Sequence, residues 1–240
     1  MPPSHPPSIP ADAASRRAAP LLEAVDLGGD RGGRRLFRHL NLQLRPGQVV
    51  WLRGRNGRGK TSLLRLLAGL ATPVAGRVQV DGVVLRQSGP GWRQRLHHIG
   101  HPNALKDDLS VAESLRFFAA LQGRRFDNAE GRAALGRLGI EPLAAAAVGT
   151  LSQGQRRRVA LARLALSLSE PQPSVWLLDE PFDALDEDGI RRLNSLLTDH
   201  ARRGGSTLLT SHQALSLTDP APWVFDLDDT AAVATLAPLR

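Results

Sequence analysis

The sequence predicts an α/β fold: a mixed sheet with helices, a small antiparallel β subdomain and an inserted helical subdomain. Three observations favour this fold. Short apolar segments of strand type occur at 49–52, 175–178 and 207–211, and each runs into polar residues. Further strand patterns flank the first of these segments, and a long stretch with helical periodicity separates the first from the second. At 240 residues the chain suits one large domain, or one domain with a subdomain.

Strand patterns begin the ordered part of the chain. Residues 1–20 are rich in proline, serine and alanine, which predicts a disordered arm. The segments 21–27 and 36–44 are predicted as strands joined by a turn over 28–33, and 78–84 as a further strand with Asp81-Gly82 as a turn or bulge. These strands lie on both sides of the apolar segment at 49–52, which predicts the small antiparallel sheet beside a main parallel one.

A glycine-rich loop follows the strand at 49–52 and precedes a leucine-rich helical segment at 61–70. Its pattern G-x-x-x-x-G-K-[ST] is that of a phosphate-binding P-loop, which favours a P-loop NTPase core. Glycines let backbone N–H groups converge on phosphate oxygens, and the helix N-terminus adds partial positive charge. The predicted ATP-binding residues of this loop are Gly54, Arg55, Asn56, Gly57, Arg58, Gly59, Lys60, Thr61 and Ser62. The competing interpretation is a glycine-rich turn that matches by chance.

Two residues of the loop have distinct expected roles. Lys60 is expected to reach the β- and γ-phosphates, and the Thr61 hydroxyl to bind Mg²⁺. Of the 31 basic residues only Lys60 and Lys106 are lysine, so a lysine at this position favours a need for the compact ammonium group.

The pattern becomes mainly helical over about 92–168, including helices at 111–121 and 129–138, and this range is the predicted helical subdomain. Within it, Ser152 and Gln155 form a capping-box pattern at the start of a helix over 156–168. A capped helix N-terminus beside a glycine suits phosphate binding, although on its own an ordinary capped helix is the simpler interpretation.

Two acids end the apolar strand at 175–178. Asp179 is expected to help hold Mg²⁺, and Glu180 to act as general base on the attacking water. The next buried strand, 207–211, runs into His212, whose imidazole is expected to bond a γ-phosphate or its attacking water. Either feature alone is compatible with a structural role.

Bulk composition restricts the function further. The net charge of +8 suits an anionic partner, namely nucleotide, nucleic acid or an anionic membrane surface, and a merely solvated arginine-rich surface explains it equally well. The absence of cysteine excludes disulfides and thiolate chemistry. Apolar runs fall short of the ~20 residues of a membrane span, and no secretory signal pattern is present, so a separate subunit is expected to cross any membrane involved.

The motifs together resemble the ATP-binding cassette family. The resemblance rests on the loop at 54–61, the signature Leu151-Ser152-Gln153-Gly154-Gln155, the pair Asp179-Glu180, the segment Ala184-Leu185-Asp186 and His212. It covers about 21–228 and implies a nucleotide-binding domain there, with 229–240 as a C-terminal tail. It also implies an ATPase that dimerises head to tail. Each ATP then lies between the P-loop of one copy and Ser152, Gln153, Gly154 and Gln155 of the other, with Asp186 nearby.

Two positions depart from the family pattern. Arg31 stands near the place of the usual aromatic residue that stacks on adenine, and His101 stands where a glutamine usually contacts Mg²⁺. A guanidinium group stacks on a base and also pairs with phosphate. The histidines at 97, 98 and 101 are compatible with metal or haem ligation, but solvated or loop-lining roles are the favoured interpretation.

Within the family, the compact chain and the segments 99–106, 155–164, 179–186 and 211–213 resemble the ATPase subunit of the haem-export system of cytochrome c biogenesis. That resemblance implies docking on an integral membrane permease at the cytoplasmic face of the bacterial inner membrane. It also implies release of a haem-loaded periplasmic chaperone, and no nucleic-acid partner. The alternatives are the ATPase of another small-solute exporter, a soluble cassette ATPase acting on ribosomes or DNA, and a non-hydrolysing binding module.

Overall fold

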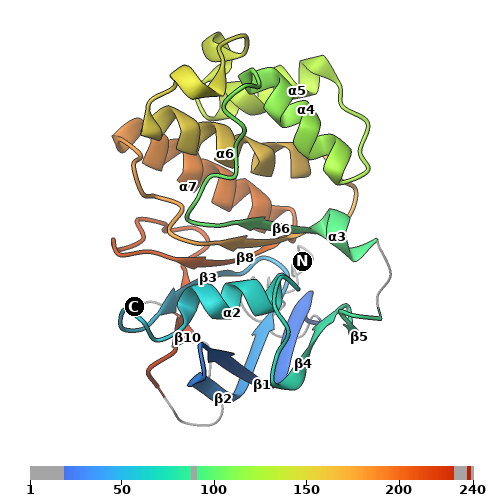
Figure 1. Ribbon diagram of the computed structural model, residues 1–240, viewed down its shortest axis with the longest axis vertical. Coiled ribbons are helices and arrows are strands. Elements are labelled where there is room, and N and C mark those ends of the chain that lie inside the picture. Colours follow the sequence, from blue (N-terminus) through green and yellow to red (C-terminus); the bar gives the residue numbers. More distant parts are fainter. Residues whose placement is uncertain (1–18, 88–90, 230–236, 239–240) are drawn as a thin grey trace, which may run out of the picture.

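The computed structural model describes residues 19–87, 91–229 and 237–238, which form two sheets and the helices around them (Figure 1). The predicted α/β fold, with its mixed main sheet and small antiparallel sheet, is confirmed. The predicted arm at 1–20 and the predicted tail at 229–240 lie almost wholly outside the described residues.

The small sheet has the strand order β2-β1-β4-β5, and all its pairs are antiparallel. Its strands are β1 (Leu22–Arg31), β2 (Arg34–Leu44), β4 (Ala75–Val80) and β5 (Val83–Val84). The predicted turn over 28–33 is too long, because β1 continues to Arg31 and only Gly32 and Gly33 turn. Gly29 of β1 pairs with Phe37 of β2, and a Cβ atom at Gly29 would lie 2.4 Å from the Phe37 ring, so a larger residue would collide with it.

The main sheet has the strand order β10-β9-β3-β8-β7-β6. Its strands are β3 (Val49–Arg53), β6 (Leu96–Ile99), β7 (Val175–Leu178), β8 (Ser206–Thr210), β9 (Trp223–Asp226) and β10 (Ala237–Pro238). All pairs are parallel except β10 with β9. Parallel strands end at one edge, so the residues that follow β3, β7 and β8 meet there.

Strand β6 falls inside the range 92–168, for which the sequence predicts a helical pattern. Its two central residues are His97 and His98, which interrupt the apolar run that marks the other strands of the main sheet. The strand lies between a four-residue helix at Trp92–Arg95 and the longer helices, which begin at Val111.

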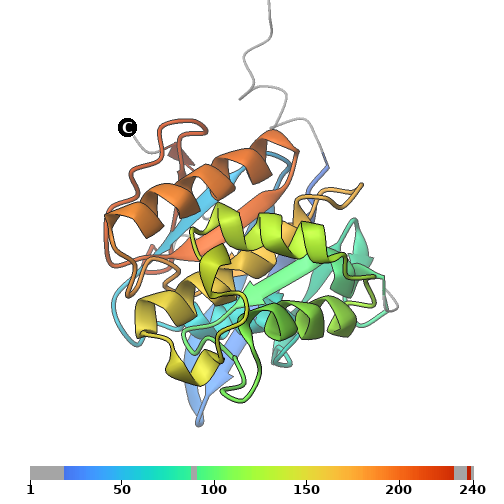
Figure 2. The same ribbon diagram turned by 90° about the horizontal axis from the view of Figure 1, so that it is seen from above.

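Helices cover the two faces of the main sheet differently (Figures 1 and 2). Helix α2 (Lys60–Leu67) lies between the two sheets, whereas α4 (Val111–Leu121), α5 (Asn128–Arg137), α6 (Gln153–Ser167) and α7 (Glu187–Arg202) lie on the other side. The short elements are α3 (Trp92–Arg95) and the 3₁₀ turns Glu141–Leu143 and Val148–Thr150. Within the described ranges, every helix is too short or too polar to cross a membrane.

Two hydrophobic cores lie on opposite faces of the main sheet. One lies around α2 and includes Val175 and Leu177, and the other lies beneath the upper helices and includes Trp176 and Leu178. Strand β7 therefore places alternate side chains in different cores, as expected for a fully buried parallel strand.

Candidate functional site

A cavity of about 300 Å³ lies at the edge of the main sheet, where the strands end. It brings together the end of β1, the P-loop, the loop after β6 and the ends of β7 and β8. The residues that line it are Arg31, Leu36, Arg55, Asn56, Gly57, Gly59, Lys60, Thr61, Ser62, His101, Asp179, Glu180 and His212. Most of the residues predicted from the sequence therefore gather around one hollow.

The P-loop has the backbone shape that its glycines predict. Gly54, Gly57 and Gly59 have φ values of 140°, 77° and 107°, a range that other residues rarely adopt. Gly59 is also the residue from which α2 begins. Lys60 Nζ lies 2.6 Å from the carbonyl oxygen of Gly54, so the ammonium group folds back over the loop. This loop at a helix N-terminus is an anion-binding cradle.

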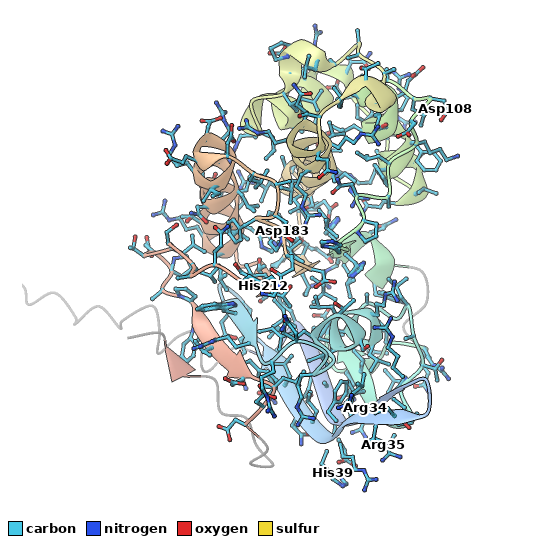
Figure 3. All side chains as sticks on the ribbon, turned by 60° about the vertical axis from the view of Figure 1, so that its left-hand side comes forward. Arg34, Arg35, His39, Asp108, Asp183 and His212 are labelled. Carbon is cyan, nitrogen blue, oxygen red and sulfur yellow. The ribbon has the colours of Figure 1, made fainter. Side chains whose placement is uncertain are left out.

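The positive charge of the described residues lies in the first part of the chain. Residues 19–87 contain twelve basic and four acidic residues, whereas residues 91–229 contain sixteen basic and eighteen acidic residues. The positive net charge therefore belongs to the part that carries the small sheet and the P-loop. Arg34 and Arg35 stand with His39 on the hairpin of β1 and β2 (Figure 3).

The P-loop is anchored by Asp228, just beyond β9. The Arg55 backbone N–H donates to Asp228 Oδ2 at 2.7 Å, and Arg58 Nε lies 3.1 Å from Asp228 Oδ1. The hydrogen bond from the Arg55 backbone is the main reason that the pKa of Asp228 lies below its usual value. Arg58 also donates to the carbonyl oxygen of Leu36 at 2.8 Å, so its side chain braces the loop. Sequence reasoning missed Asp228 because nothing local marks it.

Two threonines hold the carboxylate of Asp179. Thr61 Oγ1 donates to Asp179 Oδ2 at 2.8 Å, and Thr210 Oγ1 donates to Asp179 Oδ1 at 3.0 Å. Thr210 also accepts the backbone N–H of Glu180 at 2.8 Å. A hydroxyl and a carboxylate oxygen side by side beside a phosphate cradle fit the hard oxygen ligands that Mg²⁺ prefers. Thr210, which ends β8, was not predicted as a site residue, because its contact with Asp179 depends on the fold.

Glu180 follows in a left-handed backbone conformation, with φ of 48°. Its carboxylate accepts the backbone N–H of His212 at 3.0 Å, and the His212 ring Nε2 lies 3.6 Å from the other carboxylate oxygen. The Glu180 side chain is 11% exposed and that of His212 is 61% exposed. Backbone strain of this kind occurs often at functional sites. A nearly buried carboxylate at the cavity wall is able to accept a proton from water.

Five predicted residues lie away from the cavity: Ser152, Gln153, Gly154, Gln155 and Asp186. Ser152 caps α6 through the predicted capping box, with Oγ at 3.3 Å from the Gln155 backbone N. A Cβ atom on Gly154 would lie 2.7 Å from the carbonyl oxygen of Ala184, so this glycine permits a close backbone contact. Gly54 and Arg58 belong to the P-loop but not to the cavity lining.

Asp186 caps α7. It accepts the backbone N–H of Gly189 at 2.9 Å and pairs with Arg158. These two partners lower the pKa of Asp186 from its usual value, the backbone hydrogen bond most of all. Within one chain, the signature residues and the P-loop thus occupy separate places.

The three histidines at 97, 98 and 101 have different surroundings. His97 is buried, its Nδ1 lies 2.8 Å from Gln122 Nε2, and burial lowers its pKa to about 3. His101 is exposed, lines the cavity and has Nδ1 3.7 Å from Asp183 Oδ2. In the part of the chain that is described, no group of three or more His, Cys, Asp or Glu side chains is arranged to hold a metal ion.

This fold and this cavity define a P-loop nucleoside triphosphatase of the cassette type. The chain belongs to the ABC transporter family, whose sequence pattern matches residues 37–183. It is an ATPase that binds nucleotide, as members of this family are. The family and the ATPase activity expected from the sequence are therefore confirmed.

Relatives with related names match most of the chain. The cytochrome c biogenesis ATP-binding export protein CcmA of Albidiferax ferrireducens is 42% identical over 84% of this chain and 94% of its own length. The protein of the same name from Pseudomonas syringae pv. tomato is 47% identical over 83% of this chain and 91% of its own length. The resemblance to this branch of the family is thus confirmed.

Solved structures share the fold. An ATP-binding subunit of an ABC transporter has a TM-score of 0.78 at 24% identity and covers 91% of this chain and 90% of that one. The dimeric cassette MJ0796, in a post-hydrolysis state with ADP and Pi bound, has a TM-score of 0.75 at 22% identity, covering 91% of this chain and 99% of that one.

Proposed function

We propose that this chain is the ATP-hydrolysing subunit of the haem-export complex of cytochrome c biogenesis, and that it drives release of a haem-loaded periplasmic chaperone. The observation that supports the process is the identity of 42–47% to proteins named for cytochrome c biogenesis export. The observation that supports the chemistry is the cavity in which Lys60, Asp179 and Glu180 lie together.

In this proposal the P-loop amides and Lys60 bind the β- and γ-phosphates. Thr61 and Asp179 hold Mg²⁺, which neutralises phosphate charge and orients the phosphate oxygens when bound. Thr210 supports this arrangement because its hydroxyl fixes the other oxygen of Asp179 at 3.0 Å.

Glu180 accepts the proton of the attacking water, and His212 bonds the γ-phosphate from the end of β8. The short distance between the His212 backbone N and Glu180 Oε2, 3.0 Å, supports a joint role, because it links the two loops that flank the cavity. Arg31 lies at the cavity wall, where its guanidinium stacks on the adenine base. His101 occupies the wall at the loop after β6.

The active form is a head-to-tail homodimer. Ser152, Gln153, Gly154, Gln155 and Asp186 lie outside the cavity of their own chain, which favours a role in the cavity of a second copy. The capped N-terminus of α6 offers backbone donors and partial positive charge to a γ-phosphate held by the partner.

The dimer works at the cytoplasmic face of the bacterial inner membrane, where it is held by an integral permease. The relatives' names as export proteins support this docking on a membrane permease. A bound nucleotide accounts for the basic residues Arg31, Arg55 and Lys60 of the cavity lining without a nucleic-acid partner.

Replacement of Glu180 with glutamine tests the catalytic assignment. The variant should keep the ATP dissociation constant within about threefold, lose at least 10²-fold in hydrolysis rate and form an ATP-dependent dimer on size exclusion. Glu141→Gln, at an exposed position in the helical region, should behave as the unmodified chain. Hydrolysis by Glu180→Gln at the unmodified rate would exclude Glu180 as general base.

Purification from membranes tests the process. The full chain, tagged and extracted in mild detergent, should bring down an integral membrane subunit and a haem-binding periplasmic chaperone. Recovery with a permease but no haem protein would favour a different exporter, and recovery with ribosomes would refute membrane docking.

A further inference from the structure

Arg157 is a buried arginine in the first turns of α6, with 3% of its surface exposed. Its two neighbours in the sequence are only partly buried and form ion pairs: Arg156 pairs with Asp107, and Arg158 pairs with Asp186 and Asp188. Only the middle one of the three arginines turns toward the main sheet. A buried guanidinium is costly unless all its N–H groups find acceptors.

The Arg157 guanidinium does find acceptors for each of its nitrogens. Nη2 donates to the carbonyl oxygens of Asp179 at 2.9 Å and Glu180 at 2.5 Å, and Nε donates to that of Pro181 at 3.3 Å. Nη1 donates to the carbonyl oxygen of Gly100 at 3.0 Å and to Asn103 Oδ1 at 3.1 Å. One side chain therefore binds three consecutive carbonyls at the end of β7 and the loop after β6.

These contacts surround the strained residue of the site. The left-handed conformation of Glu180 is rare for a residue with a side chain and persists only where its surroundings fix it. Arg157 binds the carbonyl groups immediately before and after the Glu180 α-carbon, so it fixes both peptide planes that set the direction of the side chain. Thr210 fixes the same turn from the other side through the Glu180 backbone N–H.

Arg157 also joins three parts of the chain that are far apart in sequence. It stands five residues after Ser152, which caps the same helix, and it binds the loop 100–103 that carries His101 at the cavity wall. A shift of α6 therefore displaces the backbone on either side of Glu180 and the loop at His101 together.

We propose that Arg157 is a positioning residue for ATP hydrolysis: it holds the Glu180 carboxylate in its reactive direction and ties that direction to the position of the signature helix. The inference rests on the proposed function, because it assumes that Glu180 is the general base. Arg157 itself touches no substrate, since it lies behind the cavity wall and outside the lining.

Two variants test this role. Arg157→Gln retains polarity but binds at most a few of the five acceptors, and Arg157→Lys retains the charge without the planar fork. We expect kcat for ATP hydrolysis to fall by about 10²-fold in Arg157→Gln and by a smaller factor in Arg157→Lys, because small displacements of a reacting group have effects of that size. KM and the ATP dissociation constant should stay within about threefold for both.

Arg163 provides the matched control, six residues further along α6. Its guanidinium lies 4.0 Å from the Phe118 ring centroid and its Nε donates to the carbonyl oxygen of Ala160, away from the acidic turn. Arg163→Gln removes a largely enclosed arginine from the same helix, so its melting temperature should fall while kcat stays within about twofold. This comparison separates positioning of Glu180 from general loosening of the helical region.

The outcomes are distinct. A kcat within about twofold of the unmodified value in Arg157→Gln, or an equal loss in Arg163→Gln, would overturn the inference, as would a change confined to ATP affinity. If Arg157→Gln does not fold, Arg157→Lys is the test: a lower kcat at constant KM supports the inference, and an unchanged kcat overturns it. If Glu180→Gln hydrolyses ATP normally, the proposed function fails; if it is inactive while both Arg157 variants are fully active, only the inference fails.

Discussion

Thr61 donates its hydroxyl hydrogen to Oδ2 of Asp179 over 2.8 Å, joining the first turn of α2 to the end of β7 across 118 residues of sequence. In the proposed function, the bond places the two oxygen ligands of Mg²⁺ beside the phosphates bound by the P-loop. It also ties the P-loop to the strand that Glu180 follows, so the proposed binding residues and the proposed general base are joined directly.

Removal of the Asp179 charge should raise the Mg²⁺ requirement. Asp179→Asn keeps the shape and the bond to Thr61 but lowers the affinity of the carboxylate position for a divalent cation. The Mg²⁺ concentration for half-maximal ATP hydrolysis should rise at least tenfold, as measured by titration with Mg²⁺ at fixed ATP. Asp199→Asn, on α7, is the control, and an unchanged Mg²⁺ requirement in Asp179→Asn would argue against a metal role.

Ser152 and Ser110 make the same capping box at the starts of α6 and α4, so they form a matched pair. Loss of either hydroxyl should lower the free energy of unfolding by about 1 kcal/mol. Only Ser152→Ala should also lower the rate of ATP hydrolysis, because only α6 is proposed to reach the nucleotide of a partner. Steady-state kinetics beside urea unfolding checks both effects, and equal rate losses in the two variants would contradict the partner-site role.

Arg31 is predicted to act on the base rather than the phosphates. Arg31→Ala should raise the ATP dissociation constant about fivefold, the size of a partly exposed cation–π contact. The dissociation constant of inorganic triphosphate, which has no base, should not change. Titration calorimetry with both ligands distinguishes the possibilities: a parallel rise for both would assign Arg31 to phosphate pairing.

His200 should make stability depend on pH. It is buried, its ring stacks on Trp176 at 3.7 Å between centroids, and burial lowers its pKa from 6.5 to about 3. The folded state thus binds a proton less readily than the unfolded chain. The contribution of His200 to the free energy of unfolding is therefore full above pH 6.5 and is lost as the pH falls toward 3.

Urea unfolding at a series of pH values checks this dependence. In His200→Gln the slope of unfolding free energy against pH between about 6 and 4 should fall by about 1.4 kcal/mol per pH unit, the value for one proton. The remaining slope includes His97, whose pKa burial also lowers to about 3. A slope equal to that of the unmodified chain would show that His200 takes up its proton without unfolding.

Local patterns account for what could be predicted. Phosphate binding requires glycines, a lysine and a hydroxyl at fixed spacing. The P-loop can therefore be recognised from residues 54–62 alone. Strands β3, β7 and β8 are uninterrupted apolar runs, and parallel pairing places their ends together. Asp179 and Glu180 could therefore be placed beside Lys60 without a structure.

Residues that act across the chain could not be found in this way. Arg157 stands among three successive arginines, and no periodicity tells which of them is buried. Asp228 and Thr210 act through partners that only the fold brings near. Strand β6 was missed because two histidines, one of them buried in the edge strand, interrupt its apolar character.

The alternation along β7 has a consequence for the chemistry at its end. Val175 and Leu177 belong to one core, and Trp176 and Leu178 to the other, so sliding the strand by one residue would move every side chain into the opposite core and place tryptophan in the core around α2. Apolar side chains that lie away from the cavity thereby determine the register of the strand. Their packing sets the position of Asp179, the first acidic residue after the strand.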